Sequence, residues 1–343
     1  MSRAAAPPPN ANNGSGEMIE AARFAADMAR VAGIVPAPLL LAVSGGPDSM
    51  AMLALAAVAL PGGIAAATVD HGLRPEAADE AAMVAAVCAD LGVAHAILTA
   101  TVPPTGASLQ AQARSVRYAL LADHARAIGA VAVATAHHAD DQAETFLMRA
   151  VRGAGLSGLA GIRPAVSIAG IRVVRPLLDW RRAELRGIAR RSTMPFVDDP
   201  ANTDERHDRS RFRRLLGDHE WLDPLRLARS AAALAEADVD LRAVADWAWE
   251  GRSTWPEPTI VTLAIDGMPR ALLRLLARRA VSAVRTAGGI TTPDWSESSN
   301  VEPLLDALAK GTRATQAGVV AGMRRGVWRF RPAPPRRNAR ETR

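Results

Sequence analysis

The chain has 343 residues, enough for two domains of ordinary size, and is 49% hydrophobic but only 4% aromatic. No apolar run approaches the ~20 residues of a membrane-spanning helix. The single cysteine, Cys88, excludes disulfides, CxxC redox pairs and cysteine-based zinc sites within one chain. The net charge of +6 favours a polyanionic partner, although a GC-rich coding sequence would produce the same arginine bias. We therefore expect a helix-rich cytoplasmic protein without membrane attachment.

Four short β-like runs alternate with helical segments in the first half of the chain. This alternation predicts βαβ units, and hence an α/β fold with a Rossmann-like parallel sheet and helices on both faces. The predicted strands are residues 38–43, 64–70, 94–100 and 131–136, and the predicted helices are 17–32, 48–60, 75–92 and 108–129. A short strand over 171–178 and a helix over 180–192 follow.

The remaining chain has a different composition. A boundary is expected at residues 220–223, followed by Ala/Leu/Arg-rich helices to about residue 312 and a final hairpin in 315–332. The predicted domains are therefore 17–220 and a mainly helical 221–330. Residues 1–16, which lack an apolar signal segment, and the basic residues 331–343 are expected to be disordered tails.

Polar clusters directly follow three of the predicted strands. They are SGGPDS at 44–49, DHGLR at 70–74 and HHADDQAET at 137–145. Ligands of parallel sheets bind beyond the carboxyl ends of the strands, so the three clusters predict one shared site.

The SGGPDS segment has the composition of a phosphate-binding turn. Its two glycines allow a tight turn and close backbone approach, while successive N–H groups and the next helix N-terminus favour an anion. Asp48 suits a Mg²⁺ ion held against phosphate oxygens. Without a lysine the segment is not a Walker loop, and the alternative is a Gly-Gly turn with Ser and Asp helix caps. The predicted ATP contacts here are Ser44, Gly45, Gly46, Pro47, Asp48 and Ser49.

This loop resembles that of the N-type ATP pyrophosphatases, which split ATP between its α- and β-phosphates. Five further segments, together with the loop, closely resemble the tRNA(Ile)-lysidine synthase family over residues 38–216. They are VDHGLRPEAADE, ARSVRY, ATAHHADDQAETFLMR, RGAGLSGLAGI and RPLLDWRRAEL. The resemblance implies an adenine nucleotide α-hydrolase-like fold and a catalytic domain at 17–220.

The resemblance also implies a reaction. ATP with Mg²⁺ adenylates the C2 oxygen of the wobble cytidine in a tRNA(Ile) with a CAU anticodon, and free L-lysine displaces AMP to form lysidine. Activation by ATP is needed because C2 of cytosine is a poor electrophile and its oxygen must first become a leaving group. The accessory domain would grip the tRNA, and the oligomeric state, including a homodimer, stays open.

Asp141 and Glu144 lie three residues apart at a helix start, where two carboxylates can hold an ammonium group. By resemblance they recognise lysine, and Asp48, Asp141 and Arg114 are the predicted catalytic residues. The alternative is a capping arrangement with Asp141 at the N-cap and Glu144 at N3.

Two histidines are candidates for the nucleotide site. His138 is expected to contact phosphate or base, and His71 is either a wall residue near the nucleotide or a satisfied loop histidine. The HHADD segment also resembles a metal cluster, but neighbouring helical residues point about 100° apart and seldom converge on one ion.

Several arginines are candidates for phosphate or RNA contacts. By resemblance, Arg114 would contact phosphate or the lysine carboxylate; its alternative is a solvated helix face. Arg152 precedes a Gly-rich turn that could approach the substrate. The basic segment 204–216 suits an RNA backbone, and its alternative is an arginine-rich face balanced by aspartates. The predicted RNA contacts are Arg152, Asn202, Arg206, Arg209 and Arg213.

The match has two departures in this last region. The family pattern is Asp-x-Ser-Asn followed by Arg-Asn-x-x-Arg, and here Ala201 and Ser210 replace the serine and the asparagine. Ala201 cannot make the side-chain hydrogen bond of the serine, and Ser210 offers a hydroxyl where the family has an amide.

Two other functions fit some of these features. A related tRNA thiolase would need several cysteines, and Cys88 lies in a helical pattern typical of a plain core residue. A nucleotide-binding RNA-binding module without catalysis would not need intact SGGPDS and DDQAET segments. Most tryptophans are expected to be core or domain-packing residues, namely Trp221, Trp247, Trp249, Trp255, Trp295 and Trp328.

Overall fold

The computed structural model describes residues 12–33, 38–72, 76–100, 109–198, 208–296 and 298–334. The chain forms two compact units, residues 1–235 and 236–343. The division falls within α9 (Pro224–Arg252), downstream of the boundary expected from composition. The first helix, α1 (Asn12–Ala32), begins earlier than expected and includes residues 12–16, which were assigned to a disordered tail.

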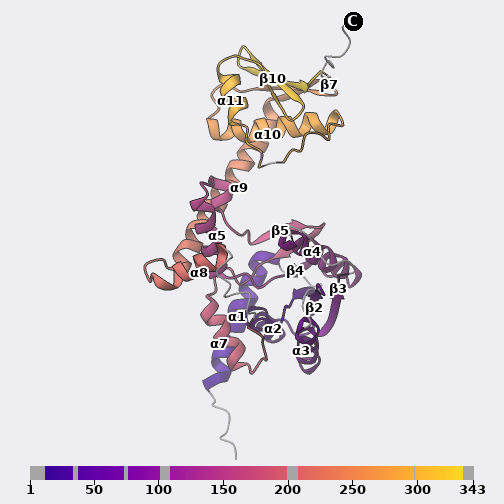
Figure 1. The fold of residues 1–343 in the computed structure, drawn as a ribbon, viewed down its shortest axis with the longest axis vertical. Helices are drawn as coiled ribbons and strands as arrows, with labels where there is room; N and C mark the ends of the chain where they lie inside the picture. The colour runs from indigo at the N-terminus through magenta and orange to yellow at the C-terminus, as the bar shows by residue number, and fades with distance from the viewer. Residues whose placement is uncertain are drawn as a thin grey trace, which may run out of the picture. The chain divides into compact units, whose positions relative to one another are not determined.

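The first unit is built on a six-stranded sheet with the order β3-β2-β1-β4-β6-β5 (Figure 1). All neighbouring strands are parallel except β5, which pairs antiparallel with β6. The strands are β1 (Leu39–Ala42), β2 (Ile64–Asp70), β3 (Ala94–Thr99), β4 (Ala132–Ala134), β5 (Ala165–Ile168) and β6 (Ile171–Val174). Four of these match predicted strands, and β6 covers the first part of the fifth.

Helices cover both faces of this sheet, as the buried strands require. Leu39 and Leu41 of β1 face a core shared with α1, α2 (Pro47–Ala59), α3 (Glu76–Asp90) and α7 (Arg182–Arg191). Leu40 faces the opposite core, with Tyr118 and Leu121 of α4 (Leu109–Ala127). Strand residues buried on both sides explain why these runs are continuously apolar.

The strand order reverses next to β1, which lies between β2 and β4. The chain moves from β1 through α2 to β2 on one side, whereas β4 lies on the other side and leads into α5 (Ala139–Val151). A crevice forms at such a switch point, and the turns after β1 and β4 lie at its mouth. The unit also contains α6 (Leu156–Leu159), α8 (Asp208–Asp218) and the first part of α9.

The second unit contains more β-structure than expected. Its antiparallel sheet has the order β7-β8-β11-β10-β9 and packs against α10 (Arg270–Ala287) and α11 (Glu302–Ala309). The strands are β7 (Ser253–Glu257), β8 (Ile260–Ala264), β9 (Ala314–Gln316), β10 (Val319–Arg324) and β11 (Val327–Pro332). The expected final hairpin is β10–β11, but the β7–β8 hairpin was missed. β7 contains Pro256, which an edge strand tolerates.

The tryptophans divide into two groups. Trp249 and Trp328 are buried in the second unit, as expected. Trp221, Trp247 and Trp255 are 71%, 72% and 44% exposed, so they are not core residues, and the other expected role, domain packing, stays a prediction for them. Cys88 is fully buried, as predicted. Among the described residues, no helix combines the length and apolar character needed to cross a bilayer.

Candidate active site

The SGGPDS segment forms the turn between β1 and α2. Gly45 has a φ of +82°, and a Cβ built there would lie 3.3 Å from the Met83 side chain. Gly46 has an ordinary extended conformation and is the N-cap of α2, which begins at Pro47 without a side-chain cap. The helix N-terminus therefore lines the cavity without a side-chain capping bond, which leaves its first amides to an anion.

The two serines of this turn have different partners. The Ser49 hydroxyl donates to the Gly46 carbonyl at 2.9 Å and accepts from the Ser44 amide at 3.2 Å. Ser49 is buried and holds the shape of the turn itself. The alternative of Ser and Asp helix caps is wrong, because the N-cap is Gly46 and no side chain caps the helix. The two hydroxyl oxygens are 3.3 Å apart, and Ser44 lines the open side.

Asp48 presents one carboxylate oxygen to a partner and leaves the other available. Its Oδ2 lies 3.4 Å from Nε2 of His138, while Oδ1 is buried without a hydrogen-bond partner within the described ranges. A hard oxygen ligand in this position fits a Mg²⁺ ion. Over the same ranges, no cluster of three or more His, Cys, Asp or Glu side chains has the arrangement of a metal centre.

The helix that follows β4 is capped differently from the expected arrangement. α5 begins at Ala139, so the N-cap is His138 and N3 is Asp141. Nδ1 of His138 accepts from the Asp141 amide at 3.3 Å, and Asp141 accepts from the His138 amide at 3.1 Å. The alternative with Asp141 at the N-cap and Glu144 at N3 therefore placed the capping box three residues too late. Because His138 also contacts Asp48, it joins the α5 N-terminus to the SGGPDS turn.

Glu144 lies one turn further along α5, where it is completely buried. Arg182 donates to its Oε1 at 3.0 Å, and Arg213 donates to the same oxygen at 3.0 Å. Arg209 donates to Oε2 at 2.8 Å and to Oδ1 of Asp141 at 2.9 Å. We call these five residues the carboxylate–arginine cluster. It connects α5 to α7 and α8, and it brings two predicted RNA contacts to the two predicted lysine ligands.

The pKa values follow this arrangement. Burial alone would raise the pKa of Asp141, but His138, His137 and Arg209 outweigh it and lower the pKa to about 2. Burial opposes protonation of His138, yet Asp141 and Asp48 raise its pKa. Burial lowers the pKa of His137 to about 3, so this imidazole is neutral at ordinary pH. The pKa of His71 is also lowered, by burial and by Arg117.

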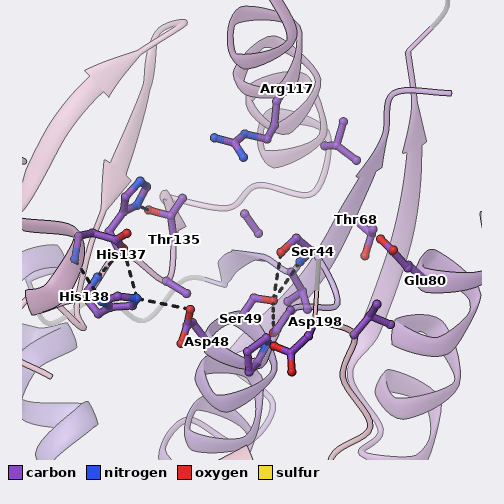
Figure 2. A pocket seen from close by; sticks show the side chains of 18 of the residues that line it. Ser44, Asp48, Ser49, Thr68, Glu80, Arg117, Thr135, His137, His138 and Asp198 are labelled. Carbon is purple, nitrogen blue, oxygen red and sulfur yellow. Dashed lines mark hydrogen bonds and ion pairs between the residues drawn. The ribbon is translucent and has the colours of Figure 1, made fainter. Parts of the chain in front are cut away.

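These groups surround a cavity of about 600 Å³ at the carboxyl ends of β1, β2 and β4 (Figure 2). Figure 2 shows Ser44, Ser49 and Asp48 on the SGGPDS turn, His138 beside His137 and joined to Asp48, and Arg117 entering from α4. The predicted site residues that line the cavity are Ser44, Gly46, Pro47, Asp48, Ser49, His71, Arg114, His138, Asp141, Arg209 and Arg213. The structure therefore brings residues of all three predicted loops to one cavity.

Other predicted residues lie elsewhere. Gly45 is beside the cavity, where its carbonyl accepts from the Val197 amide at 3.0 Å. Glu144 is behind the cavity, covered by its arginines. Arg152 is exposed at the C-cap of α5. Asn202 and Arg206 fall outside the described residues.

Sequence analysis also missed several lining residues. They are Thr68, Glu80, Arg117, Thr135, His137, Arg182, Arg186 and Asp198. Thr68 and Thr135 lie at the ends of strands beside His71 and His138, a position that could have identified them. Asp198 is ion-paired with Arg186, and only the tertiary fold brings this pair to the cavity.

Comparison with known families first defines the class. The ATP_bind_3 family, described as a PP-loop domain, matches residues 21–220, more than half of the chain. This range contains the SGGPDS turn and every residue that lines the cavity. The protein is therefore a member of the PP-loop domain family.

The relatives define the particular family. The tRNA(Ile)-lysidine synthase of Novosphingobium aromaticivorans is 45% identical over 311 residues, covering 88% of this chain and 90% of the relative. That of Zymomonas mobilis is 40% identical over 324 residues, covering 90% of this chain and 94% of the relative. The chain belongs to the tRNA(Ile)-lysidine synthase family.

A solved structure shares the fold alone. The U34-tRNA thiolase NcsA from Methanococcus maripaludis, with its [4Fe-4S] cluster, superposes with a TM-score of 0.52 at 16% identity. The match covers 64% of this chain and 80% of the thiolase. The predicted Rossmann-like sheet is thereby confirmed. The C-terminal domain, which was expected to be mainly helical, contains a five-stranded sheet as well as helices.

Proposed function

We propose that this protein ligates free L-lysine to C2 of the wobble cytidine in a CAU-anticodon tRNA(Ile), with ATP as the source of activation. The observation that carries the proposal is the uncapped helix N-terminus of the SGGPDS turn, which opens into the same cavity as Asp141 and a set of arginines. Membership of the tRNA(Ile)-lysidine synthase family supports the choice of substrates. Such a reaction belongs in the cytoplasm, where tRNA and lysine are both available.

The reaction has two balanced steps. The cytidine C2 oxygen attacks the α-phosphorus of ATP, and diphosphate leaves. The ε-amine of lysine, which must first lose a proton, then attacks C2, and AMP leaves with the former C2 oxygen. The nitrogen that is now bonded to C2 then loses a second proton. The products are lysidine, AMP and diphosphate.

The residues that would serve each step come from different loops. The amides at the start of α2 would bind phosphate oxygens, and Asp48 would hold the Mg²⁺ ion that accompanies ATP. That ion would neutralise phosphate charge. Arg114, with its guanidinium 4.9 Å from the Tyr118 ring centroid, is stiffened at the cavity wall and would contact the transferred phosphate.

Lysine recognition would use the carboxylates of α5. Asp141 is fixed by its capping bonds with His138 and keeps a low pKa, so it is a carboxylate at working pH. Glu144 would act together with Asp141 on the substrate ammonium. The six arginines around the cavity would balance the charge of ATP and of the tRNA backbone; they are Arg114, Arg117, Arg182, Arg186, Arg209 and Arg213.

The thiolase alternative conflicts with the only cysteine. Cys88 is fully buried, and burial raises the pKa of its thiol to about 11. A buried thiol of this kind is neither a nucleophile nor a cluster ligand. The chain contains no second cysteine.

The proposed function is tested by incubating the protein with ATP, Mg²⁺, radiolabelled lysine and unmodified CAU-anticodon tRNA(Ile). We expect lysine to enter the RNA and the Asp48→Ala variant to abolish that incorporation. ATP–pyrophosphate exchange without incorporation would indicate a different nucleophile. If the protein shows neither ATP–pyrophosphate exchange nor lysine incorporation, a nucleotide-binding module without catalysis is the better description.

A further inference from the structure

The cation expected in the lysine site is already supplied by the chain itself. Arg209 of α8 donates to Asp141 at 2.9 Å and to Glu144 at 2.8 Å, and so bridges the two carboxylates that the proposed function assigns to lysine. A guanidinium and an ammonium are both cations that seek paired carboxylates. Lysine cannot take its full set of contacts while Arg209 keeps these two.

The burial of the partners shows which of them is able to leave. The side chains of Glu144 and Asp141 are 1% and 16% exposed, whereas that of Arg209 is 46% exposed. The carboxylates are fixed within α5, while the guanidinium lies at the open rim. Glu144 retains Arg182 and Arg213 when Arg209 departs, so no buried charge is left unpaired.

Arg209 also belongs to the basic segment that we expect to meet RNA. Phosphate oxygens are the main alternative partner for a guanidinium, because they match its paired donors as well as a carboxylate does. A phosphate that captures Arg209 would expose Asp141 and the Oε2 atom of Glu144 together.

We propose that Arg209 is an internal competitor of lysine, released when α8 binds the RNA backbone. This inference rests on the proposed function, since it concerns the same lysine site. The competition couples the two ligands: RNA binding raises the lysine affinity of a site that Arg209 occupies in the free enzyme. Linkage requires the effect to be reciprocal, so lysine must raise the affinity for RNA by the same factor.

Equilibrium dialysis with radiolabelled lysine tests the competition, in the absence of ATP and with or without an unmodified CAU anticodon stem-loop RNA. For the wild type we expect the stem-loop to raise lysine affinity by about tenfold. Arg209→Gln should bind lysine about tenfold more tightly than the wild type without RNA, and should gain less than about threefold when RNA is added. Arg211→Gln removes the same charge from an exposed position of α8 and should behave like the wild type.

An Arg209→Gln variant that binds lysine no better than Arg211→Gln without RNA would overturn the proposal. If Arg209→Gln does not fold, the wild type is measured alone. Lysine should then raise the affinity of the wild type for the stem-loop by the same factor by which the stem-loop raises its affinity for lysine. If neither ligand changes the affinity for the other, the competition is refuted. The proposed function is judged separately, by lysine incorporation into tRNA. If the wild type incorporates lysine but the two ligands do not affect each other's binding, the proposed function holds and only the competition by Arg209 is refuted.

Discussion

At the scale of single residues, Gly45 and Gly46 illustrate how neighbours in one turn meet different demands. Gly45 has a φ of +82° and a Met83 methyl group 3.3 Å from where a Cβ would lie, whereas at Gly46 only the Ser44 hydroxyl lies within 4 Å, at 3.8 Å. We expect Gly45→Ala to lower the free energy of unfolding by about 2 kcal/mol. Gly46→Ala should lower it by less, about 0.5 kcal/mol, because Ala is a poorer N-cap than Gly. Urea unfolding of both variants measures the difference, and equal losses would contradict the strained turn.

A second residue-scale prediction concerns acid. Folding lowers the pKa of Asp141 from its usual 3.8 to about 2, so its ionised form stabilises the fold above pH 4, and this stabilisation is lost as the pH falls towards 2. The difference in unfolding free energy between the wild type and Asp141→Asn should be constant above pH 5 and shrink by about 2 kcal/mol by pH 2. Urea titrations across this range measure it.

The exposed Asp218, at the end of α8, provides the control for that titration. Asp218→Asn should give a difference below about 0.5 kcal/mol throughout. A difference for Asp141→Asn that stays constant down to pH 2 would mean that His138 and Arg209 do not stabilise its charge.

The residues whose place at the cavity could be predicted are those whose position depends on local sequence. Ser44 and Asp48 lie in the turn and first helical residues after β1, and His71 follows β2, so their place at the sheet edge could be derived from spacing. The role of His138 as the N-cap could not, because it depends on where α5 begins. The arginine partners of Glu144 could not be foreseen either, since Arg209 and Arg213 are more than sixty residues away.

At the scale of elements, Glu144 joins α5 to α7 and α8 through three arginines. Glu144→Gln leaves these guanidinium groups without their shared carboxylate, and we expect a loss of about 3 kcal/mol. Asp123→Asn also removes an ion pair with an arginine, but its side chain is 72% exposed, and the loss should be below about 0.5 kcal/mol. Thermal unfolding compares the stabilities of the two variants. A Glu144→Gln variant as stable as the wild type would show that α8 is held by other contacts.

Elements with strong periodicity were predictable, and the exceptions have physical causes. The parallel strands β1 and β2 are apolar on both faces and stand out from the flanking helices. β7 does not stand out, because it is an edge strand in which four of the five residues are exposed, Pro256 among them. The exposed Trp247 shows the same limit, since helical spacing does not determine which side of α9 the second unit covers.

At the scale of the whole molecule, the two units have separate hydrophobic cores, and Cys88 reports on only one of them. Its buried thiol, with a pKa of about 11, should resist alkylation at pH 8 until the first unit opens. In increasing urea, we expect alkylation of Cys88 and amide exchange in β10 and β11 to follow different transitions. Mass spectrometry measures both, and coincident midpoints would indicate a single cooperative unit.

The carboxylate–arginine cluster also limits how this sequence can diverge. One acidic side chain is the shared partner of three basic ones, so an exchange at Glu144 leaves several charges without that partner at once, whereas an exchange at the exposed Arg209 leaves Glu144 paired with Arg182 and Arg213. Neutral drift by a single step is therefore closed at Glu144. Descendants of this chain should either inherit Glu144 or replace it together with several of its partners.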